Sequence, residues 1–287
     1  MSAVFVTGAT GTVGSAVVEH LLQAGEHVIA GVPETDTDHR LPAGVEVRQF
    51  RFGAPDAELE AAMAGADRMF LMRPPPIADV QTFLFPVIDA ANRLGMRQTV
   101  FLSLQGVQAN RATPHHAVEK YLRSTKTPST FLRPNFFMQN LSTTYADEIR
   151  QTGRIFVPAG RSLTAFIDAR DIGRVAAAVL TGPGHVGRAY TLSGELALSY
   201  AAVARTMTEV LGRPIVYARP SEKEYLAYLA ARGEPEDYIA VQRMIYRVVR
   251  FNISALPNRS VRRLTGQPAT TFREFVSDHA DVWTPDR

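Results

Sequence analysis

The stretch Val4-Phe5-Val6-Thr7-Gly8-Ala9-Thr10-Gly11-Thr12-Val13-Gly14 decides how the rest of this sequence is interpreted. Its first residues are apolar, rich in β-branched and aromatic side chains, and end at a glycine, which predicts a short buried strand. Apolar side chains then recur every three or four residues from Val13 to Leu21, as expected of one face of a helix. A glycine-rich turn between a strand and a helix indicates a dinucleotide-binding loop.

Each glycine of the turn has a separate physical role in such a loop. Gly8 permits the tight turn, Gly11 lets the backbone approach a pyrophosphate, and Gly14 allows the helix to pack closely on the strand. Free N–H groups at the helix start would face the phosphates. The expected cofactor contacts of the loop are Gly8, Thr10, Gly11, Thr12, Val13 and Gly14. The alternative is a glycine turn that binds nothing.

Predicted strands and helices alternate along the first half of the chain. Strands are expected at residues 4–6, 27–32, 45–52, 68–72, 99–104 and 129–132. This alternation predicts an α/β fold, a doubly wound parallel sheet with helices on both faces. The second half is less regular, with a helix expected at 175–180 after an N-cap at Asp171, a short strand at 190–192, and further helices at 200–211, 223–231, 236–252 and 272–283. We expect a cofactor domain at 1–150, to which 166–182 returns, and a mainly helical substrate region at 151–287.

Composition excludes several classes of protein. The chain has 287 residues, 46% of them hydrophobic, and a net charge of +3, so it is neither disordered nor fibrous. It contains no cysteine, which excludes disulfides, thiolate zinc sites and a cysteine nucleophile. We find no targeting signal and no apolar run near the roughly 20 residues that cross a bilayer. A cytoplasmic protein with no membrane partner is expected.

The glycine spacing G-x-x-G-x-x-G and several later stretches carry a family resemblance. These stretches are Phe70-Leu71-Met72, Val100-Phe101-Leu102-Ser103, Leu132-Arg133-Pro134-Asn135-Phe136-Phe137-Met138-Gln139-Asn140, Phe166-Ile167-Asp168-Ala169-Arg170-Asp171-Ile172, Leu264-Thr265-Gly266 and Thr271-Phe272-Arg273-Glu274-Phe275. Together they resemble the NmrA-like branch of atypical short-chain dehydrogenase/reductases. The resemblance implies a Rossmann domain with a small C-terminal substrate domain. It also implies NAD(P)H-dependent reduction of quinones or of azo and triphenylmethane dyes, or NADP sensing with little catalysis.

The resemblance bears on the choice of dinucleotide. Relatives carry arginine directly after the second strand, where this chain has Pro33 and Glu34, and a carboxylate there would repel a 2′-phosphate. Arg51, at the end of the third strand, is the candidate that compensates, with Arg40 a weaker one. Alternatively, Arg51 is a solvated charge. The resemblance slightly favours NADP(H) over NAD(H), and Glu34, Arg51 and Phe52 are the expected contacts at this end of the cofactor.

The usual short-chain dehydrogenase acid, tyrosine followed four residues later by lysine, is absent from the sequence. In the corresponding region, His116 and Lys120 are spaced to share one face of a helix, after a strand that ends near Ser103. The hypothesis is that Lys120 contacts the nicotinamide ribose and His116 donates or relays a proton. The alternative is a surface helix with a solvated lysine and a packed histidine. A quinone-like acceptor would need no strong enzymatic acid.

Residues that follow strands four to six are expected to wall the site, because ligands bind at the carboxyl ends of parallel strands. Arg73, Pro74, Ser103, Asn135 and Phe136 are the further cofactor contacts that we predict. Phe137, Asn140 and Phe166 are the predicted substrate contacts, with only one of Phe136 and Phe137 facing the site. We interpret Asp168 and Asp171 as structural.

The sequence also bears on metal ions and on binding partners. The histidines show no metal-binding spacing, so no metal is expected. Seven arginines lie between Arg243 and Arg273 with no acidic residue among them, which predicts a solvated cationic face, recognition of an acidic substrate or a docking surface. No nucleic-acid motif is present.

The predicted partner is a small aromatic or quinone-like molecule, and a homodimer is one expected assembly. The competing functions are an NAD(P)-sensing regulator and a non-redox enzyme of the cyclase or lyase type.

Overall fold

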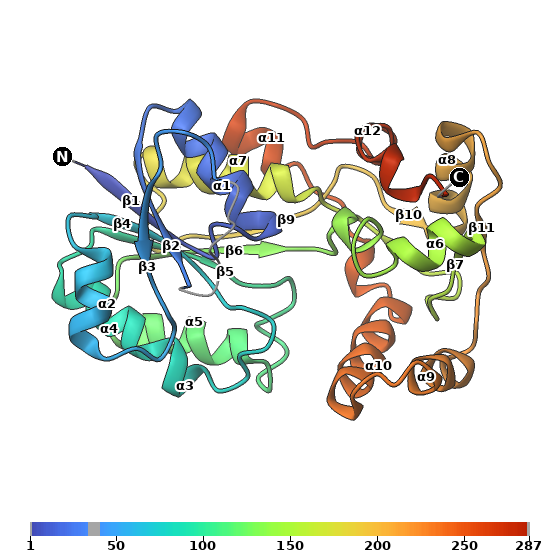
Figure 1. Ribbon diagram of the computed structural model, residues 1–287, viewed down its shortest axis with the longest axis horizontal. Coiled ribbons are helices and arrows are strands. Elements are labelled where there is room, and N and C mark those ends of the chain that lie inside the picture. Colours follow the sequence, from blue (N-terminus) through green and yellow to red (C-terminus); the bar gives the residue numbers. More distant parts are fainter. Residues whose placement is uncertain (1, 34–40, 286–287) are drawn as a thin grey trace. The chain divides into compact units, whose positions relative to one another are not determined.

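The computed structural model describes residues 2–33 and 41–285 (Figure 1). The chain divides into two compact units, each assembled from separated segments. The first unit consists of Met1–Pro134, Ala169–Leu192 and Ser260–Gln267, and the second of Asn135–Asp168, Ser193–Arg259 and Pro268–Arg287. The chain therefore first passes from the first unit to the second directly after Pro134, whereas the sequence predicted a boundary at residue 150. The sequence did not predict that Ser260–Gln267 belongs to the first unit.

A seven-stranded sheet, in which every neighbouring pair is parallel, forms the centre of the first unit, with strand order β3-β2-β1-β4-β5-β6-β9. The strands are β1 Ala3–Thr7, β2 His27–Val32, β3 Glu46–Gln49, β4 Arg68–Met72, β5 Gln98–Leu102, β6 Ser129–Pro134 and β9 Ala189–Leu192. The order reverses between β1 and β4, which is the point where doubly wound sheets bind ligands. The predicted α/β Rossmann-type fold is confirmed, and the strand predicted at 190–192 is its seventh strand.

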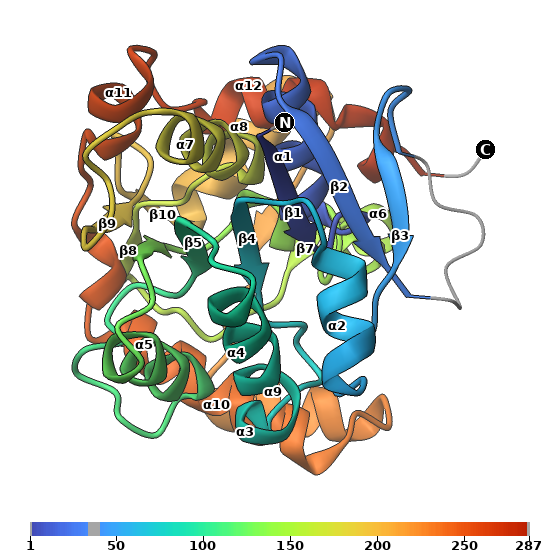
Figure 2. The same cartoon turned by 90° about the vertical axis from the view of Figure 1, so that its left-hand side faces the viewer.

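Helices cover both faces of this sheet (Figure 2). One face is covered by α1 Thr12–Gln23 and α7 Ala169–Thr181, with α11 Ser260–Thr265 beside α7, and the other by α2 Asp56–Met63, α3 Val80–Phe83, α4 Phe85–Arg93 and α5 Pro114–Ser124. All five residues of β1 are buried, as a strand covered on both sides requires. Because α7 begins at Ala169, Asp171 lies inside its first turn and pairs with Arg174. The prediction of Asp171 as the N-cap was wrong.

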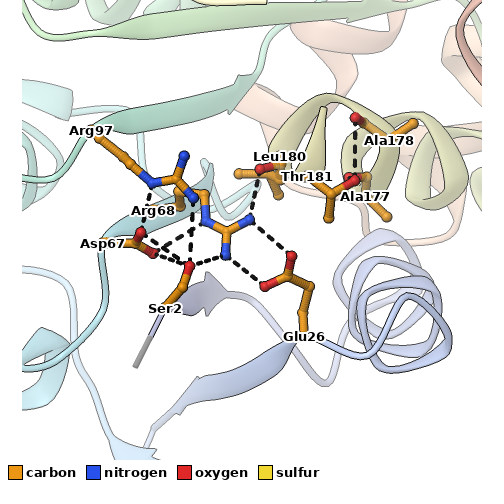
Figure 3. A network of polar contacts seen from close by, with 9 residues as sticks. All are labelled: Ser2, Glu26, Asp67, Arg68, Arg97, Ala177, Ala178, Leu180 and Thr181. Carbon is orange, nitrogen blue, oxygen red and sulfur yellow. Dashed lines mark hydrogen bonds and ion pairs between the residues drawn. The ribbon is translucent and has the colours of Figure 1, made fainter. Parts of the chain in front are cut away.

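A buried arginine forms ion pairs and a backbone hydrogen bond at the amino ends of the strands (Figure 3). Arg68, the first residue of β4, is 2% exposed and forms ion pairs with Glu26 at 2.6 Å and with Asp67 at 3.2 Å. Its Nη1 also donates to the carbonyl oxygen of Leu180, in the last turn of α7, at 2.8 Å. Burial opposes ionisation of Asp67, but hydrogen bonds from Arg97 and Arg68 lower its pKa below the ordinary value. This network lies at the opposite end of β4 from the edge at which ligands bind.

The second unit combines helices with two small sheets. Its strands are β7 Arg154–Ile155 paired with β11 Val216–Tyr217, and β8 Leu163–Thr164 paired with β10 Leu198–Ser199. Its helices are η1 Met138–Asn140, α6 Ala146–Thr152, α8 Tyr200–Leu211, α9 Glu222–Ala231, α10 Glu236–Arg250, η2 Ile253–Ala255, α12 Phe272–Asp278 and η3 Ala280–Trp283. An aromatic core holds them together, and Trp283 at its centre donates from Nε1 to the carbonyl oxygen of Leu141 at 2.9 Å.

The arginine-rich tract is only partly the uncompensated cationic face that the sequence suggests. Arg247 of α10 pairs with Glu222 at 2.8 Å, and Arg273 pairs with Glu209, so acidic residues from other helices reach the tract. Helix α10 buries Gln242, Tyr246 and Val249, whereas Val241 is 45% exposed.

Candidate functional site

The glycine-rich turn connects β1 to α1 by a tight, well-formed loop. Gly8 has a φ of +63°, in the left-handed region that favours glycine, and its carbonyl oxygen accepts from the amide of Gly11 at 3.0 Å. Gly11 is the N-cap of α1 with an extended conformation, and no side chain caps the helix among the described residues. The first amide groups of α1 therefore keep their capacity to donate to a ligand.

Gly14 makes the closest approach in the loop. A Cβ atom on Gly14 would lie 1.9 Å from the Gly8 carbonyl oxygen, whereas one on Gly11 would lie 3.3 Å from the same atom. Only the first of these distances is impossible without moving backbone. The structure thus agrees with the packing role predicted for Gly14. A Cβ atom on Gly11 would make a tight contact, which a shift of a few tenths of an ångström in the Gly8 carbonyl would relieve.

This turn fits the phosphates of a dinucleotide. Thr10 and Thr12 are exposed and Gly8 and Gly11 are half-buried, so backbone amides and two hydroxyl groups can reach an anion. Val13 is buried, which leaves only its backbone amide for such a contact. The positive end of the α1 dipole stabilises negative charge at the same place.

Arg51 lies near the end of β2, where the adenosine part of a dinucleotide is expected. Strands β2 and β3 are parallel, with Val32 opposite Gln49, and the amide of Phe50 donates to the Val32 carbonyl oxygen at 2.8 Å. Arg51 follows directly and is exposed, so its guanidinium group is accessible. Phe52 is half-buried and packs edge-to-face on Phe50, with ring centroids 5.0 Å apart. The predicted residues Glu34 and Arg40 lie outside the described residues.

Ser103 belongs to a buried ionic network that sequence reasoning did not predict. Its hydroxyl donates to Glu119 Oε1 at 2.7 Å, and Arg133 donates to both carboxylate oxygens of Glu119, at 2.9 and 2.6 Å. Arg123 adds a further contact at 2.8 Å. Burial raises the pKa of Glu119, but hydrogen bonds from Arg133 and Ser103 outweigh this effect and lower it below the ordinary value. The Ser103 hydroxyl is therefore committed to a carboxylate.

His116 and Lys120 lie on α5, as predicted, in different surroundings. His116 is half-buried, and its Nδ1 donates to the Val107 carbonyl oxygen at 3.1 Å. Because a carbonyl oxygen can only accept, neutral His116 carries its proton on Nδ1 and leaves Nε2 as an acceptor. Lys120 is exposed. Proton donation by His116 would therefore require its imidazolium form.

Arg73 and His115 come together at the same edge of the sheet. Arg73 follows β4, and its Nη1 donates to the carbonyl oxygens of Pro74, Pro75 and Ile77 at 3.0, 2.9 and 2.6 Å. His115 lies in the first turn of α5, where burial and the charge of Arg73 lower its pKa to about 4. The sequence predicted a role for His116 and not for His115, because spacing alone does not indicate which of two adjacent histidines lies beside Arg73.

The predicted site residues of the second unit differ in how deeply they are buried. Asn135 is 6% exposed, and its amide donates to the Ser254 carbonyl oxygen at 2.8 Å while its side-chain oxygen accepts from the Phe136 amide. Phe136 and Phe137 are both half-buried, although one exposed and one buried ring were expected. Asn140, in η1, is half-buried as well.

Phe166 is a core residue of the second unit. It is 3% exposed and packs edge-to-face on Tyr200, with ring centroids 5.5 Å apart. The sequence predicted that this ring lines a substrate wall, whereas in this structure the aromatic core covers its surface. Asp168 is fully buried and accepts from Gln139 Nε2 at 2.8 Å, which agrees with the structural role expected of it.

Comparison with known proteins identifies the family. A model of the NmrA-like family matches residues 1–275. The chain belongs to the NmrA-like family. This NmrA-like protein is 32% identical over 284 residues to an NAD(P)H azoreductase of Xenophilus azovorans, with 96% of this chain and 98% of the relative covered. It is 34% identical over 289 residues to a (4-alkanoyl-5-oxo-2,5-dihydrofuran-3-yl)methyl phosphate reductase of Streptomyces griseus subsp. griseus, with 99% and 100% covered.

A solved structure agrees with this family assignment. The NADPH-dependent quinone oxidoreductase QOR2 of Escherichia coli, complexed with NADPH, superposes with a TM-score of 0.83 at 25% identity, over 96% of this NmrA-like protein and 99% of the other chain. These whole-length similarities support an NAD(P)H-dependent oxidoreductase, as the sequence predicted. Among the described residues, no helix has the length and apolar character to cross a membrane, and no group of three or more acidic or histidine side chains is arranged to hold a metal.

Proposed function

We propose that this NmrA-like protein is an NAD(P)H-dependent reductase of small aromatic, quinone-like acceptors. The observation that carries the proposal is the glycine turn, where Gly14 packs against the Gly8 carbonyl and the uncapped start of α1 faces outward. The azoreductase and the quinone oxidoreductase support the substrate class. When bound, a reduced nicotinamide supplies the hydride for such a reaction.

In this proposal, the first unit binds the cofactor. Backbone amides of the glycine turn bind the pyrophosphate, and Lys120, exposed on α5, contacts the nicotinamide ribose. Phe136 and Phe137 are both half-buried, and we propose that only one of the two rings faces the site. Since neutral His116 has no proton on Nε2, we propose that it accepts a hydrogen bond, and that an electron-poor acceptor takes its proton from water.

We infer a preference for NADP(H) over NAD(H). Arg51 is exposed and lies two residues beyond Gln49, the residue of β3 that pairs with Val32. Its guanidinium group supports this choice because guanidinium groups bind phosphate by charge-assisted hydrogen bonds. QOR2, complexed with NADPH, supports it as well.

The reductase function is tested with NADPH and NADH, each supplied with menadione, methyl red and malachite green. We expect saturable loss of the reduced-nicotinamide absorbance with at least one acceptor. Cofactor binding without oxidation across the panel would favour the NAD(P)-sensing regulator. Failure to bind either cofactor, measured by fluorescence titration, would favour a non-redox enzyme.

Replacing Arg51 by alanine should weaken NADPH binding by about tenfold or more, because a charge-assisted hydrogen bond contributes roughly 1.5–3 kcal/mol. NADH binding should stay unchanged, since NADH lacks the 2′-phosphate. Calorimetric titration of both cofactors measures the difference. Arg93→Ala is the matched control, because Arg93 lies on α4 and pairs with Glu60 at 2.5 Å. Equal loss of both cofactors in the Arg51 variant would contradict this role.

A further inference from the structure

Two buried side-chain nitrogen atoms of the first unit, Arg73 Nε and His115 Nδ1, lack a hydrogen-bond partner among the described residues. Arg73 follows the last residue of β4, and His115 lies in the first turn of α5, directly after the loop that leaves β5. Both positions belong to the carboxyl edge of the sheet, the edge at which doubly wound sheets bind their ligands. Buried polar groups are normally paired, so two unpaired nitrogens at this edge point to a ligand.

The guanidinium group of Arg73 is fixed in place. Three backbone carbonyls, of Pro74, Pro75 and Ile77, accept from its Nη1 and fold the loop around the side chain. In the part of the chain that the structure describes, no carboxylate forms an ion pair with Arg73. Arg73 thus presents its Nε–H as a fixed donor directly after Met72, whose side chain abuts Gly8 of the cofactor loop.

His115 supplies the complementary group. Its ring lies 6.1 Å from that of Phe101 in β5, between centroids. Burial and the positive charge of Arg73 lower the pKa of His115 to about 4, against the opposing charge of Glu119, so the imidazole is neutral at physiological pH. In the tautomer protonated on Nε2, Nδ1 is a hydrogen-bond acceptor.

We propose that Arg73 Nε and His115 Nδ1 together bind the carboxamide of the nicotinamide ring and so fix the ring's orientation. A carboxamide offers one acceptor and one donor in a plane, which matches one donor on Arg73 and one acceptor on His115. A phosphate or a quinone oxygen offers only acceptors and would leave His115 Nδ1 unpaired in this tautomer. The inference rests on the proposed function, because it requires that the chain bind a nicotinamide dinucleotide.

The test compares three ligands by calorimetric titration. They are NADP⁺, its 3-acetylpyridine analogue, which keeps the carbonyl but replaces the amide NH₂ by methyl, and 2′-phospho-ADP-ribose, which lacks the nicotinamide. The corresponding NAD series replaces them if the wild type binds it more tightly. His115→Phe should weaken NADP⁺ binding by about tenfold and leave the other two ligands unchanged. His115→Asn, whose side-chain oxygen can accept, should restore most of the loss.

Arg73→Met should weaken binding of both ring-bearing ligands by about tenfold and leave 2′-phospho-ADP-ribose unchanged, because both rings keep the carbonyl that Arg73 binds. His27→Phe, at the amino end of β2, is the control and should affect none of the ligands. Thermal unfolding verifies that each variant is folded.

Several results would overturn the carboxamide assignment. Equal weakening of all three ligands would place Arg73 and His115 on the phosphates or the ribose. Unchanged binding of all three would leave ordered water as their partner. Wild-type protein that binds 2′-phospho-ADP-ribose but does not prefer NADP⁺ to its acetylpyridine analogue would refute the inference and leave the proposed function standing. Absence of binding for every ligand would refute both.

Discussion

Replacing Gly14 by alanine will abolish tight NAD(P)H binding, although alanine usually favours a helix over glycine by roughly 1 kcal/mol. The added Cβ would lie 1.9 Å from the carbonyl oxygen of Gly8 and 2.6 Å from its carbonyl carbon, so backbone of the cofactor loop must move. We expect at least about a tenfold increase in the NADPH dissociation constant, together with a loss of stability of roughly 1–3 kcal/mol from overpacking. Fluorescence titration and thermal unfolding measure the two effects.

Two other glycines separate loop distortion from general destabilisation. Gly25→Ala, just after the end of α1, meets no atom within 4 Å but forces alanine to a φ of +77°, so it should lower stability without changing cofactor affinity. Gly11→Ala brings its methyl group to 3.3 Å from the Gly8 oxygen, a tight contact that a small shift relieves, so it should lower stability and cofactor affinity less than Gly14→Ala does. Wild-type cofactor affinity in Gly14→Ala would contradict the assignment of this turn.

Replacing Glu119 by glutamine should destabilise the first unit by roughly 3–5 kcal/mol, the usual cost of removing one partner from a buried ion pair. Arg133 is only 7% exposed and donates two hydrogen bonds to the Glu119 carboxylate. Glutamine is neutral, so the buried guanidinium group would lose its negatively charged partner. Denaturant unfolding measures the change. Arg123→Ala is the control, since that arginine contacts the same carboxylate from a side chain that is 53% exposed, and it should cost less than about 1 kcal/mol.

The pH dependence of stability gives the same network a second test. The pKa of Glu119 is lowered in the folded protein, so ionised Glu119 stabilises the fold above its unfolded pKa, near 4.3. That contribution is lost as the pH falls through the lower, folded-state pKa, and the Glu119→Gln variant should lack it. A variant with wild-type stability at neutral pH would show that the buried ions are compensated in another way.

Local sequence was sufficient to locate the strands of the seven-stranded sheet and the cofactor loop, but it did not predict the four short strands of the second unit. The bounds of β2 and β4, His27–Val32 and Arg68–Met72, coincide with the predicted strands because apolar runs flanked by polar or turn residues define such strands locally. The glycine turn was likewise predicted with its strand and its helix, since the conformational need for glycine is encoded at each position. The fold class followed from these local patterns, whereas the family and the enzyme class followed from the resemblance of motifs along nearly the whole chain.

Other features depended on contacts between distant segments. Spacing alone indicated His116 and Lys120 on one helix face, but it gave no sign that His115 is the histidine beside Arg73. The sequence predicted Phe166 as a residue of the substrate wall, but Tyr200, 34 positions later in the chain, packs on its ring. The seven arginines from Arg243 to Arg273 appeared unopposed because Glu209 and Glu222, which pair with two of them, precede the tract in the chain.

By itself, the sequence determined the alternating strands and helices, the dinucleotide loop at residues 8–14 and membership of a reductase family. Only the tertiary structure decided which polar groups meet. Buried Arg68 lies between the half-buried Glu26 and Asp67, and buried Glu119 lies between Ser103 and Arg133. The physical reason is that strand and helix formation depends on neighbours a few residues away. The protonation, pairing and exposure of an ionisable side chain depend instead on groups that folding brings from elsewhere in the chain.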